Sequence, residues 1–372
     1  MYVEPFEMER FQSLWENVVD YNLSESGVHP LQLYELLTME ELNDVATIHL
    51  GYNQTNGAEE LRAKIANLYQ GAAVPNILVT TGSSEANFLT TWNLIEPGDE
   101  LALMLPNYMQ IWGIANALGA KVQPFHLIPK GGRWQIDWQE FEQAVTSKTK
   151  LIAVCNPNNP TGAQLNSDEI EKICNKAAEV GAWILSDEVY RGAERVGDTT
   201  PTFWGNYEKV IVICGLSKAY GLPGLRIGWI AAPPDLIEKL WSYHDYTTIC
   251  PNPLSDYLAR IALSSPNREK ILERTQKIIK ENFQILEDWI NSHNDLFEYI
   301  PPIAGAITIV KYNLNLKSLE LVTRLRKATS VLLVPGEHFL MENYLRFGFG
   351  SPSDYLQEAL DRISAFIAEN GK

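Results

Sequence analysis

Short apolar runs alternate with amphipathic stretches along the first two-thirds of the chain. The runs are rich in β-branched residues and only four to seven residues long, which is typical of buried strands. We expect strands at 77–81, 101–105, 121–127, 151–155, 182–186, 210–213 and 227–232. Helices are expected between several of them, at 58–69, 85–95 and 167–180. Strands that alternate with helices at this spacing predict an α/β fold with a doubly wound, mostly parallel sheet between layers of helices.

The pattern changes after Ala232, where Pro233-Pro234 leads into more helical sequence. A long helix is expected over 267–291 and a last one over 353–370, with strand-like runs at 306–311, 331–335 and 344–348. This predicts a smaller α+β domain, for which a chain of 372 residues with 45% apolar residues is long enough. The expected division is an N-terminal arm and part of the small domain (1–45), a large domain (46–240) and a small C-terminal domain (241–372).

The segment from Cys214 to Trp229 places reactive groups at the end of a buried strand. Lys218 follows the run 210–213 beside Ser217, and Arg226 stands eight residues later. Partial burial should lower the pKa of the Lys218 amine and free it to form a Schiff base. The planar guanidinium of Arg226 suits a phosphate. An amine, a hydroxyl and a phosphate-binding group together suggest pyridoxal phosphate, although Lys218 as a solvated loop lysine is the alternative.

Other polar candidates also follow expected strands. Ser83 and Ser84 stand at the start of a helix, where they suit an anion or simply cap the helix. Asp187 should face a cation, either a protonated pyridine nitrogen or a structural arginine. Tyr108 could stack on a flat ring or pack on its neighbours. Because the carboxyl ends of parallel strands form the ligand-binding edge of such sheets, their shared location favours one site.

Expectations for a loop and several further residues follow from their surroundings in the sequence. The loop 156–162 contains two prolines and is expected to be rigid, so that it orients an asparagine amide. Arg346 lies in an apolar strand and should meet a carboxylate ligand or form a structural salt bridge. In the N-terminal part, Glu25 and His29 are expected to be ordinary loop residues, and Tyr52 a packed tyrosine.

Charge and composition exclude several classes of protein. The net charge of −16 and a pI near 4.9 argue against a nucleic acid or an anionic membrane as partner. No apolar run approaches the roughly 20 residues of a membrane span, and the first residues do not resemble a signal peptide. The four cysteines form no CxxC pair and the six histidines are scattered, so no metal site is expected. We therefore expect a cytoplasmic protein.

Four motifs in combination resemble the class I/II aminotransferases, the pyridoxal-phosphate enzymes of fold type I. They are Asn-Pro-Asn-Asn-Pro-Thr-Gly at 156–162, Ser-Asp-Glu-Val-Tyr at 186–190, Leu-Ser-Lys with an arginine eight residues later, and the late Arg346. The similarity extends from about Tyr21 to the C-terminus. It implies an enzyme that moves the α-amino group of an amino acid to a 2-oxo acid.

The resemblance also implies roles for single residues. Lys218 would be the catalytic residue, which forms the internal aldimine with pyridoxal 5'-phosphate and then transfers the proton. Asp187 would pair with the pyridine nitrogen, and Asn159 and Tyr190 would hydrogen-bond to the phenolic oxygen. The remaining cofactor contacts would come from the phosphate-binding Ser83, Ser84, Ser217 and Arg226, from Tyr108 stacked on the ring, and from Tyr52 of the neighbouring subunit of a homodimer. Substrate binding would fall to Ser26, Gly27, Asn159 and Arg346, with Arg346 on the α-carboxylate.

Two departures from the family pattern bear on the prediction. Gly215 stands where many relatives have a hydroxyl residue, so the phosphate site could have one donor fewer. The loop 23–30 is unlike the usual one and faintly resembles that of the capreomycidine synthases, which work on arginine derivatives. A lyase of the C–S β-lyase type or a cyclase on the same cofactor is therefore the alternative. A non-enzymatic sensor and a Rossmann dinucleotide binder are disfavoured, the latter because no GxGxxG follows any strand.

Overall fold

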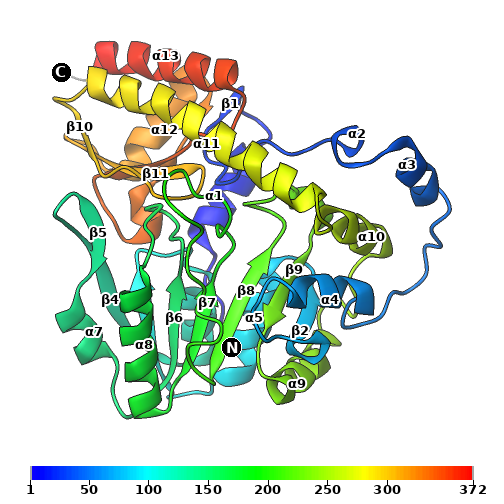
Figure 1. Ribbon diagram of the computed structural model, residues 1–372. Helices are drawn as coiled ribbons and strands as arrows, with labels where there is room; N and C mark the ends of the chain where they lie inside the picture. Colours follow the sequence, from blue (N-terminus) through cyan, green and yellow to red (C-terminus); the bar gives the residue numbers. More distant parts are fainter. Residues whose placement is uncertain (1, 371–372) are drawn as a thin grey trace.

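An eight-stranded sheet forms the centre of the larger part of the molecule in this computed structural model, which describes residues 2–370 (Figure 1). The strand order is β2-β9-β8-β7-β6-β3-β4-β5, and only β9 and β5 run against the other strands. The expected mostly parallel sheet is confirmed. Its strands are β2 (Ile77–Thr80), β3 (Glu100–Leu105), β4 (Lys121–Lys130), β5 (Arg133–Ile136), β6 (Thr149–Cys155), β7 (Trp183–Asp187), β8 (Val210–Gly215) and β9 (Gly228–Ala231).

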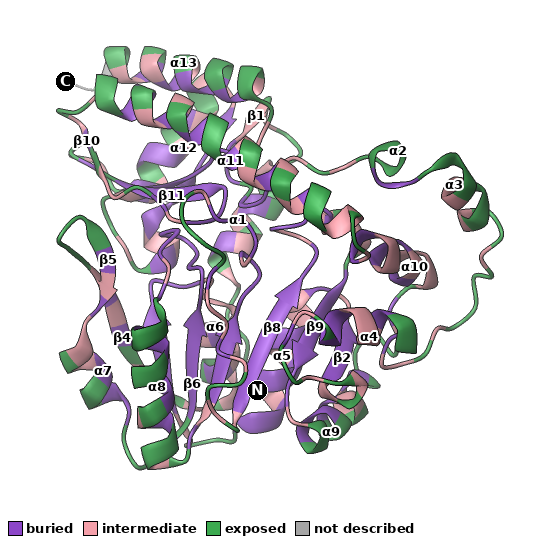
Figure 2. Cartoon of the chain, viewed as in Figure 1, coloured by how far each residue is buried: buried purple, intermediate pink, exposed green. Residues whose placement is uncertain are grey.

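Both faces of this sheet are buried, which explains why its strands read as continuous apolar runs. In β8, Val210 and Val212 pack into one apolar cluster, whereas Ile211 and Ile213 pack into the cluster on the opposite face. This two-residue period is the alternation of side chains along a strand. The helices turn their exposed faces outward (Figure 2). One face is covered by α5 (Ser83–Leu94), α6 (Gln110–Leu118) and α9 (Pro234–His244), the other by α4 (Glu59–Ala66), α7 (Trp138–Ala144) and α8 (Ser167–Val180).

The smaller part is built around a four-stranded antiparallel sheet of order β10-β11-β14-β13. The expected run 331–335 is divided between two sheets, because β12 pairs with β1 near the N-terminus whereas β13 pairs with β14. These strands are β1 (Tyr21–Asn22), β10 (Phe297–Tyr299), β11 (Ile307–Tyr312), β12 (Val331–Leu332), β13 (Val334–Pro335) and β14 (Tyr344–Gly348). The remaining α-helices are α1 (Glu7–Trp15), α2 (Leu33–Leu36), α3 (Met39–Val45), α10 (Pro253–Ala262), α11 (Asn267–Ser292), α12 (Ser318–Thr329) and α13 (Ser353–Asn370), and short 3-10 helices lie at Val74–Asn76, Pro223–Leu225 and Gly336–Phe339.

The loop of residues 23–28, called here the 23–28 loop, is held against the end of β14 by backbone contacts. Gly348 N donates to the Leu23 carbonyl at 2.7 Å, and His29 N donates to the Gly350 carbonyl at 2.7 Å. A Cβ atom at Gly348 or Gly350 would overlap the carbonyl oxygen of Glu25 or Gly27. The absence of side chains at these two glycines therefore allows the loop to lie next to the carboxyl end of β8.

The segment that contains α2 and α3 stands away from the two sheets (Figure 1). Its surface is partly apolar, since Tyr34 and Met39 are each 72% exposed and Tyr52 is 87% exposed. Tyr52 is therefore not packed within its own chain, contrary to the expectation from the residue alone. Among the described residues, no helix is both long enough and apolar enough to span a membrane.

Candidate active site

A cavity of about 280 Å³ lies at the carboxyl ends of the central strands. Residues of α1 and β14 form its other walls. It brings together side chains that are far apart in the sequence, as expected for the ligand-binding edge of a parallel sheet. The lining includes most of the residues predicted from the sequence: Ser26, Ser83, Ser84, Tyr108, Asn159, Asp187, Tyr190, Ser217, Lys218, Arg226 and Arg346. Gly27 and Tyr52 are not among the lining residues.

One end of the cavity is suited to a phosphate. Ser83 and Ser84 form the first turn of α5, where backbone N–H groups are free and the helix dipole favours an anion. Arg226 Nη1 donates to Ser217 Oγ at 3.4 Å and to the Pro223 carbonyl at 3.2 Å. Among the described residues Arg226 forms no ion pair with a carboxylate, so its charge is available to a ligand.

Two glycines explain the shape of this end. Gly82 has φ +79°, and a Cβ there would overlap the Arg226 guanidinium, so glycine permits their close approach. Gly215 is the position at which the resemblance leads one to expect a hydroxyl residue. A Cβ at Gly215 would lie 3.0 Å from the Ile227 carbonyl oxygen, which is tighter than an ordinary contact. The backbone of the neighbouring strand therefore crowds the position from which a further hydroxyl would reach the phosphate site.

Asp187 is a buried carboxylate without a cationic partner. It is 6% exposed and accepts hydrogen bonds from Asn87 Nδ2 at 3.0 Å and from Val189 N at 3.2 Å. No ion pair to Asp187 occurs within the described part of the chain, so the alternative of a structural arginine is wrong. Burial raises the pKa of Asp187. A protonated ring nitrogen would supply the missing positive charge.

Arg346 is likewise buried without a carboxylate. It is 1% exposed and donates from Nη1 to Asn159 Oδ1 at 3.0 Å and from Nη2 to the Ser24 carbonyl at 2.5 Å, while its Nε has no hydrogen-bond partner. Because Asn159 Oδ1 is taken by Arg346, the amide NH₂ group is the part of Asn159 left for a ligand. Tyr190, 2% exposed, lines the same cavity. Arg346 forms no salt bridge with any carboxylate of residues 2–370, and a carboxylate ligand would complete its charge pairing.

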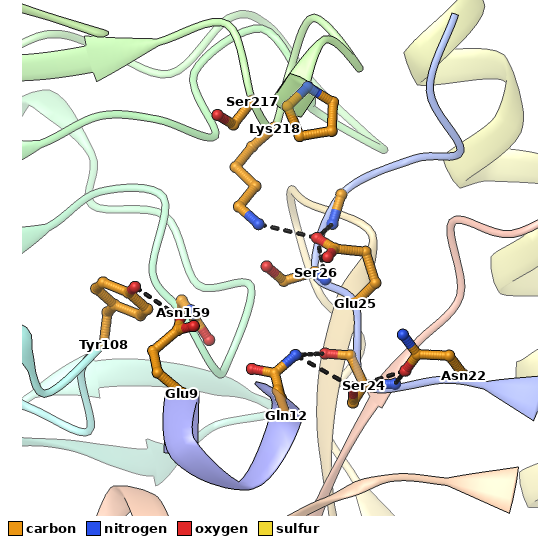
Figure 3. A network of polar contacts seen from close by, with 12 residues as sticks. Glu9, Gln12, Asn22, Ser24, Glu25, Ser26, Tyr108, Asn159, Ser217 and Lys218 are labelled. Carbon is orange, nitrogen blue, oxygen red and sulfur yellow. Dashed lines mark hydrogen bonds and ion pairs between the residues drawn. The ribbon is translucent and has the colours of Figure 1, made fainter. Parts of the chain in front are cut away.

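Lys218 forms an ion pair that the sequence did not indicate. Its Nζ lies 2.9 Å from Glu25 Oε1, as Figure 3 shows. Burial lowers the pKa of Lys218, but Glu25 and Tyr190 raise it, and the net shift is upward. The Lys218 ammonium brings the pKa of Glu25 down to about 2, against the effect of burial. The expectations of an ordinary loop residue at 25 and of a lowered lysine pKa were therefore wrong.

The Glu25 carboxylate also binds backbone N–H groups of the loop that is predicted to contact the substrate. Its Oε1 accepts hydrogen bonds from Ser26 N at 2.8 Å and from Gly27 N at 3.1 Å. These two N–H groups are the ones that the resemblance assigns to the substrate carboxylate. In the structure they hold the Glu25 carboxylate next to Lys218 instead (Figure 3).

Sequence reasoning missed one whole wall of the cavity. Glu9, Gln12 and Glu16, on α1 and at its C-terminal end, line the cavity together with Met8. Glu9 Oε1 accepts the hydrogen bond of Tyr108 Oη at 2.6 Å and so orients that ring. Their spacing of i, i+3 and i+7 places the three side chains on one face of a helix. This spacing is visible in the sequence and could have indicated that they act together.

Comparisons with known proteins agree with this geometry. The family model of aminotransferase class I and II matches residues 38–363, most of the chain. The chain belongs to the class I and II aminotransferases. A crystal structure of a pyridoxal-phosphate-dependent aminotransferase from Streptococcus suis superimposes with a TM-score of 0.93 at 34% sequence identity, covering 100% of both chains. This aminotransferase is therefore an enzyme of fold type I, of a family that depends on pyridoxal phosphate, as the resemblance implied.

Two named relatives differ in their activity. A capreomycidine synthase from Streptomyces vinaceus is 28% identical over 357 residues, covering 94% of the aminotransferase chain and 90% of the relative. An aspartate aminotransferase from Sulfurisphaera tokodaii is 28% identical over 336 residues, covering 85% and 82%. The faint likeness of the loop 23–30 to that of the capreomycidine synthases is thus accompanied by similarity along most of the chain.

We predict that Glu25→Gln accelerates the reaction of the cofactor-free protein with pyridoxal phosphate near pH 7. Removing the carboxylate lowers the pKa of Lys218, so a larger fraction of the amine is neutral and nucleophilic. The rate, followed by absorbance in a stopped-flow instrument, should rise several-fold, and its pH profile should shift to lower pH. Glu40→Gln, the same charge change on exposed α3, should leave the profile in place. An unchanged profile in Glu25→Gln would show that the ion pair does not control Lys218.

Proposed function

We propose that this chain catalyses transamination between an amino acid and a 2-oxo acid, with pyridoxal 5'-phosphate in the cavity and Lys218 as the residue that bonds to it. One observation carries the proposal. Asp187, Arg226 and Arg346 line the same cavity, and none of them has a partner of opposite charge among the described residues. Asp187 and Arg346 are buried, and because charges are rarely buried unpaired, a ligand should bring the charges missing there. Arg226 is exposed, and its guanidinium is free to pair with an anion at the open end of the cavity. A protonated pyridine, a phosphate and an α-carboxylate would pair with these three residues in turn.

Each of these residues then has a defined task toward the cofactor. Asp187 keeps the proton on the ring nitrogen, and the cofactor supplies the electron sink for negative charge at the substrate α-carbon. Asn159 and Tyr190 donate hydrogen bonds to the phenolic oxygen. The phosphate is held by Ser83, Ser84, Ser217 and Arg226, and Tyr108 packs against the ring.

Lys218 and Arg346 divide the work on the substrate. Arg346 binds the α-carboxylate with two parallel hydrogen bonds and thereby orients the Cα–H bond toward the reacting face. Lys218, once neutral and separated from Glu25, would take the proton from the substrate α-carbon as a general base and would then donate it as a general acid. For Gly27 N to reach the same carboxylate, Glu25 must first leave the backbone N–H groups that it occupies.

A lyase or cyclase on the same cofactor is the second candidate, and the similarity to a capreomycidine synthase favours it. Both reactions require the same lysine, ring-nitrogen partner and carboxylate-binding arginine. They differ in the fate of the substrate side chain and of the amino group. The products therefore distinguish the two candidates.

We predict that the purified enzyme, given an amino-acid pool and a 2-oxo acid acceptor, forms new 2-oxo acids in amounts equal to the acceptor aminated. Lys218→Ala should lower the rate of this reaction about a thousandfold, since positioned general bases contribute gains of this order. Lys239→Ala, an exposed lysine on α9, should retain the wild-type rate. Mass spectrometry of the products is the measurement. If ammonia or a cyclised product formed without any acceptor, the transaminase proposal would be wrong and the enzyme would be a lyase or a cyclase.

We also propose a homodimer in which Tyr52 completes the neighbouring site. Tyr52 is 87% exposed, does not line its own cavity, and lies near other exposed apolar residues, such as Leu50 at 80%. Such a surface is typical of a protein interface. The domain bounds at 45 and 240 and a cytoplasmic location remain predictions from the sequence.

A subunit-mixing experiment tests the shared site. Tyr52→Ala and Lys218→Ala should each have low activity alone. After mixing and subunit exchange, a hybrid dimer contains one site with Lys218 from one subunit and Tyr52 from its partner, so activity should rise toward a quarter of the wild-type value, given a statistical mixture. Two inactive variants that stay inactive while exchanging subunits, as followed by native mass spectrometry, would contradict the shared site.

A further inference from the structure

One wall of the cavity is lined by hydrogen-bond acceptors rather than by donors. Glu9, Gln12 and Glu16 project from α1 at i, i+3 and i+7, and Glu25 joins them from the 23–28 loop. We call these four residues the acidic wall. The roles proposed for the cofactor and the α-carboxylate use none of them as a direct contact. The acidic wall is therefore available to another part of a ligand.

Gln12 indicates independently that this wall faces a donor. Its side chain is 7% exposed, and Nε2 donates to the Ser24 carbonyl at 2.9 Å and to Ser24 Oγ at 3.1 Å. Because a carbonyl can only accept, the NH₂ end of the amide must point at Ser24. The Gln12 oxygen is consequently turned to the other side, where Glu9 lies (Figure 3), and it accepts no hydrogen bond within residues 2–370. The Gln12 side chain is nearly buried and lines the cavity, so its oxygen is left to accept a hydrogen bond from a donor there.

The charges on the acidic wall are only partly compensated. Glu9 accepts from Tyr108, and Glu25 pairs with Lys218. The Glu16 carboxylate makes neither a hydrogen bond nor an ion pair with the rest of the described chain, and burial together with Glu25 and Glu9 raises its pKa. When Lys218 engages the cofactor, Glu25 loses its cation as well. Two carboxylates without a cation, Glu16 and Glu25, and the Gln12 amide oxygen then lie beside the place where the substrate binds.

We propose that the acidic wall binds the cationic side chain of the amino-acid substrate, a guanidinium or an ammonium group. This inference rests on the proposed function, since it assumes that Arg346 holds the α-carboxylate of the same molecule. A guanidinium offers five N–H donors in a plane and an ammonium offers three, and either could reach several of these acceptors at once. A neutral or acidic side chain would leave the acceptors unpaired or add repulsion.

Equilibrium binding to a protein that cannot turn over tests this proposal. Lys218→Ala, loaded with pyridoxal phosphate, also leaves Glu25 without its lysine, as in the loaded enzyme. Calorimetry would give the dissociation constants of L-arginine against L-citrulline, which has a neutral ureido group in place of the guanidinium, and of L-lysine against L-norleucine. We expect at least one cationic member to bind about tenfold or more tightly than its neutral counterpart, because hydrogen bonds to charged groups are roughly twice as strong as neutral ones.

Variants on α1 locate the preference. Adding Glu16→Gln to the Lys218→Ala protein should remove most of the preference for the cation. Glu7→Gln, the same charge change on the same helix but on an exposed residue outside the cavity, should keep it. A preference for arginine would identify a guanidinium and one for lysine an ammonium.

The outcomes separate the two proposals. If cationic and neutral members bind with equal affinity, or if the Glu16→Gln protein keeps the preference for the cation, the acidic wall does not bind the substrate side chain. Neither result contradicts the proposed transamination. If no amino acid of any class binds to the loaded protein, the proposed function itself fails.

Discussion

The cost of burying charge is the constraint on which this structure depends. The ends of the parallel strands place Asp187, Lys218 and Arg226 at one edge of the sheet, and β14 adds Arg346. Within the described chain only Lys218 has a partner of opposite charge, namely Glu25. Asp187 and Arg346 are buried, and desolvated charges destabilise a fold unless something compensates them, whereas Lys218 is partly buried and Arg226 is exposed. We interpret the site as one whose charges are completed by the cofactor and the substrate, so that binding should also stabilise the protein.

The N-terminal segment contacts both the small domain and the cavity at the strand ends of the large sheet. β1 pairs with β12, and the glycines at the end of β14 bring the 23–28 loop over the end of β8. The same arrangement places α1 against the cavity, where Glu9 orients Tyr108. One short region, far from Lys218 in the sequence, therefore contributes both the partner of Lys218 in its ion pair and the acidic wall.

Much of the fold and of the cofactor site could be predicted from the sequence, because both follow from local patterns. The apolar runs specified the strands, and each of Asp187, Ser217 and Lys218 lies at or just after a strand end. The role of Glu25 could not be predicted, since its contact with Lys218 joins residues 193 positions apart and depends on glycines in β14. The spacing of the acidic wall was visible, but the sequence does not show what α1 faces. The role that we propose for Tyr52 involves a second chain, so the pattern of a single chain does not predict it.

The most direct test of the central claim is to reduce the enzyme loaded with pyridoxal phosphate with borohydride and to map the modified peptides by mass spectrometry. Our account predicts one pyridoxyl group per chain, on Lys218, and its loss in Lys218→Ala. A pyridoxyl group on a different lysine, or a protein that takes up no cofactor although it is folded, would contradict the account.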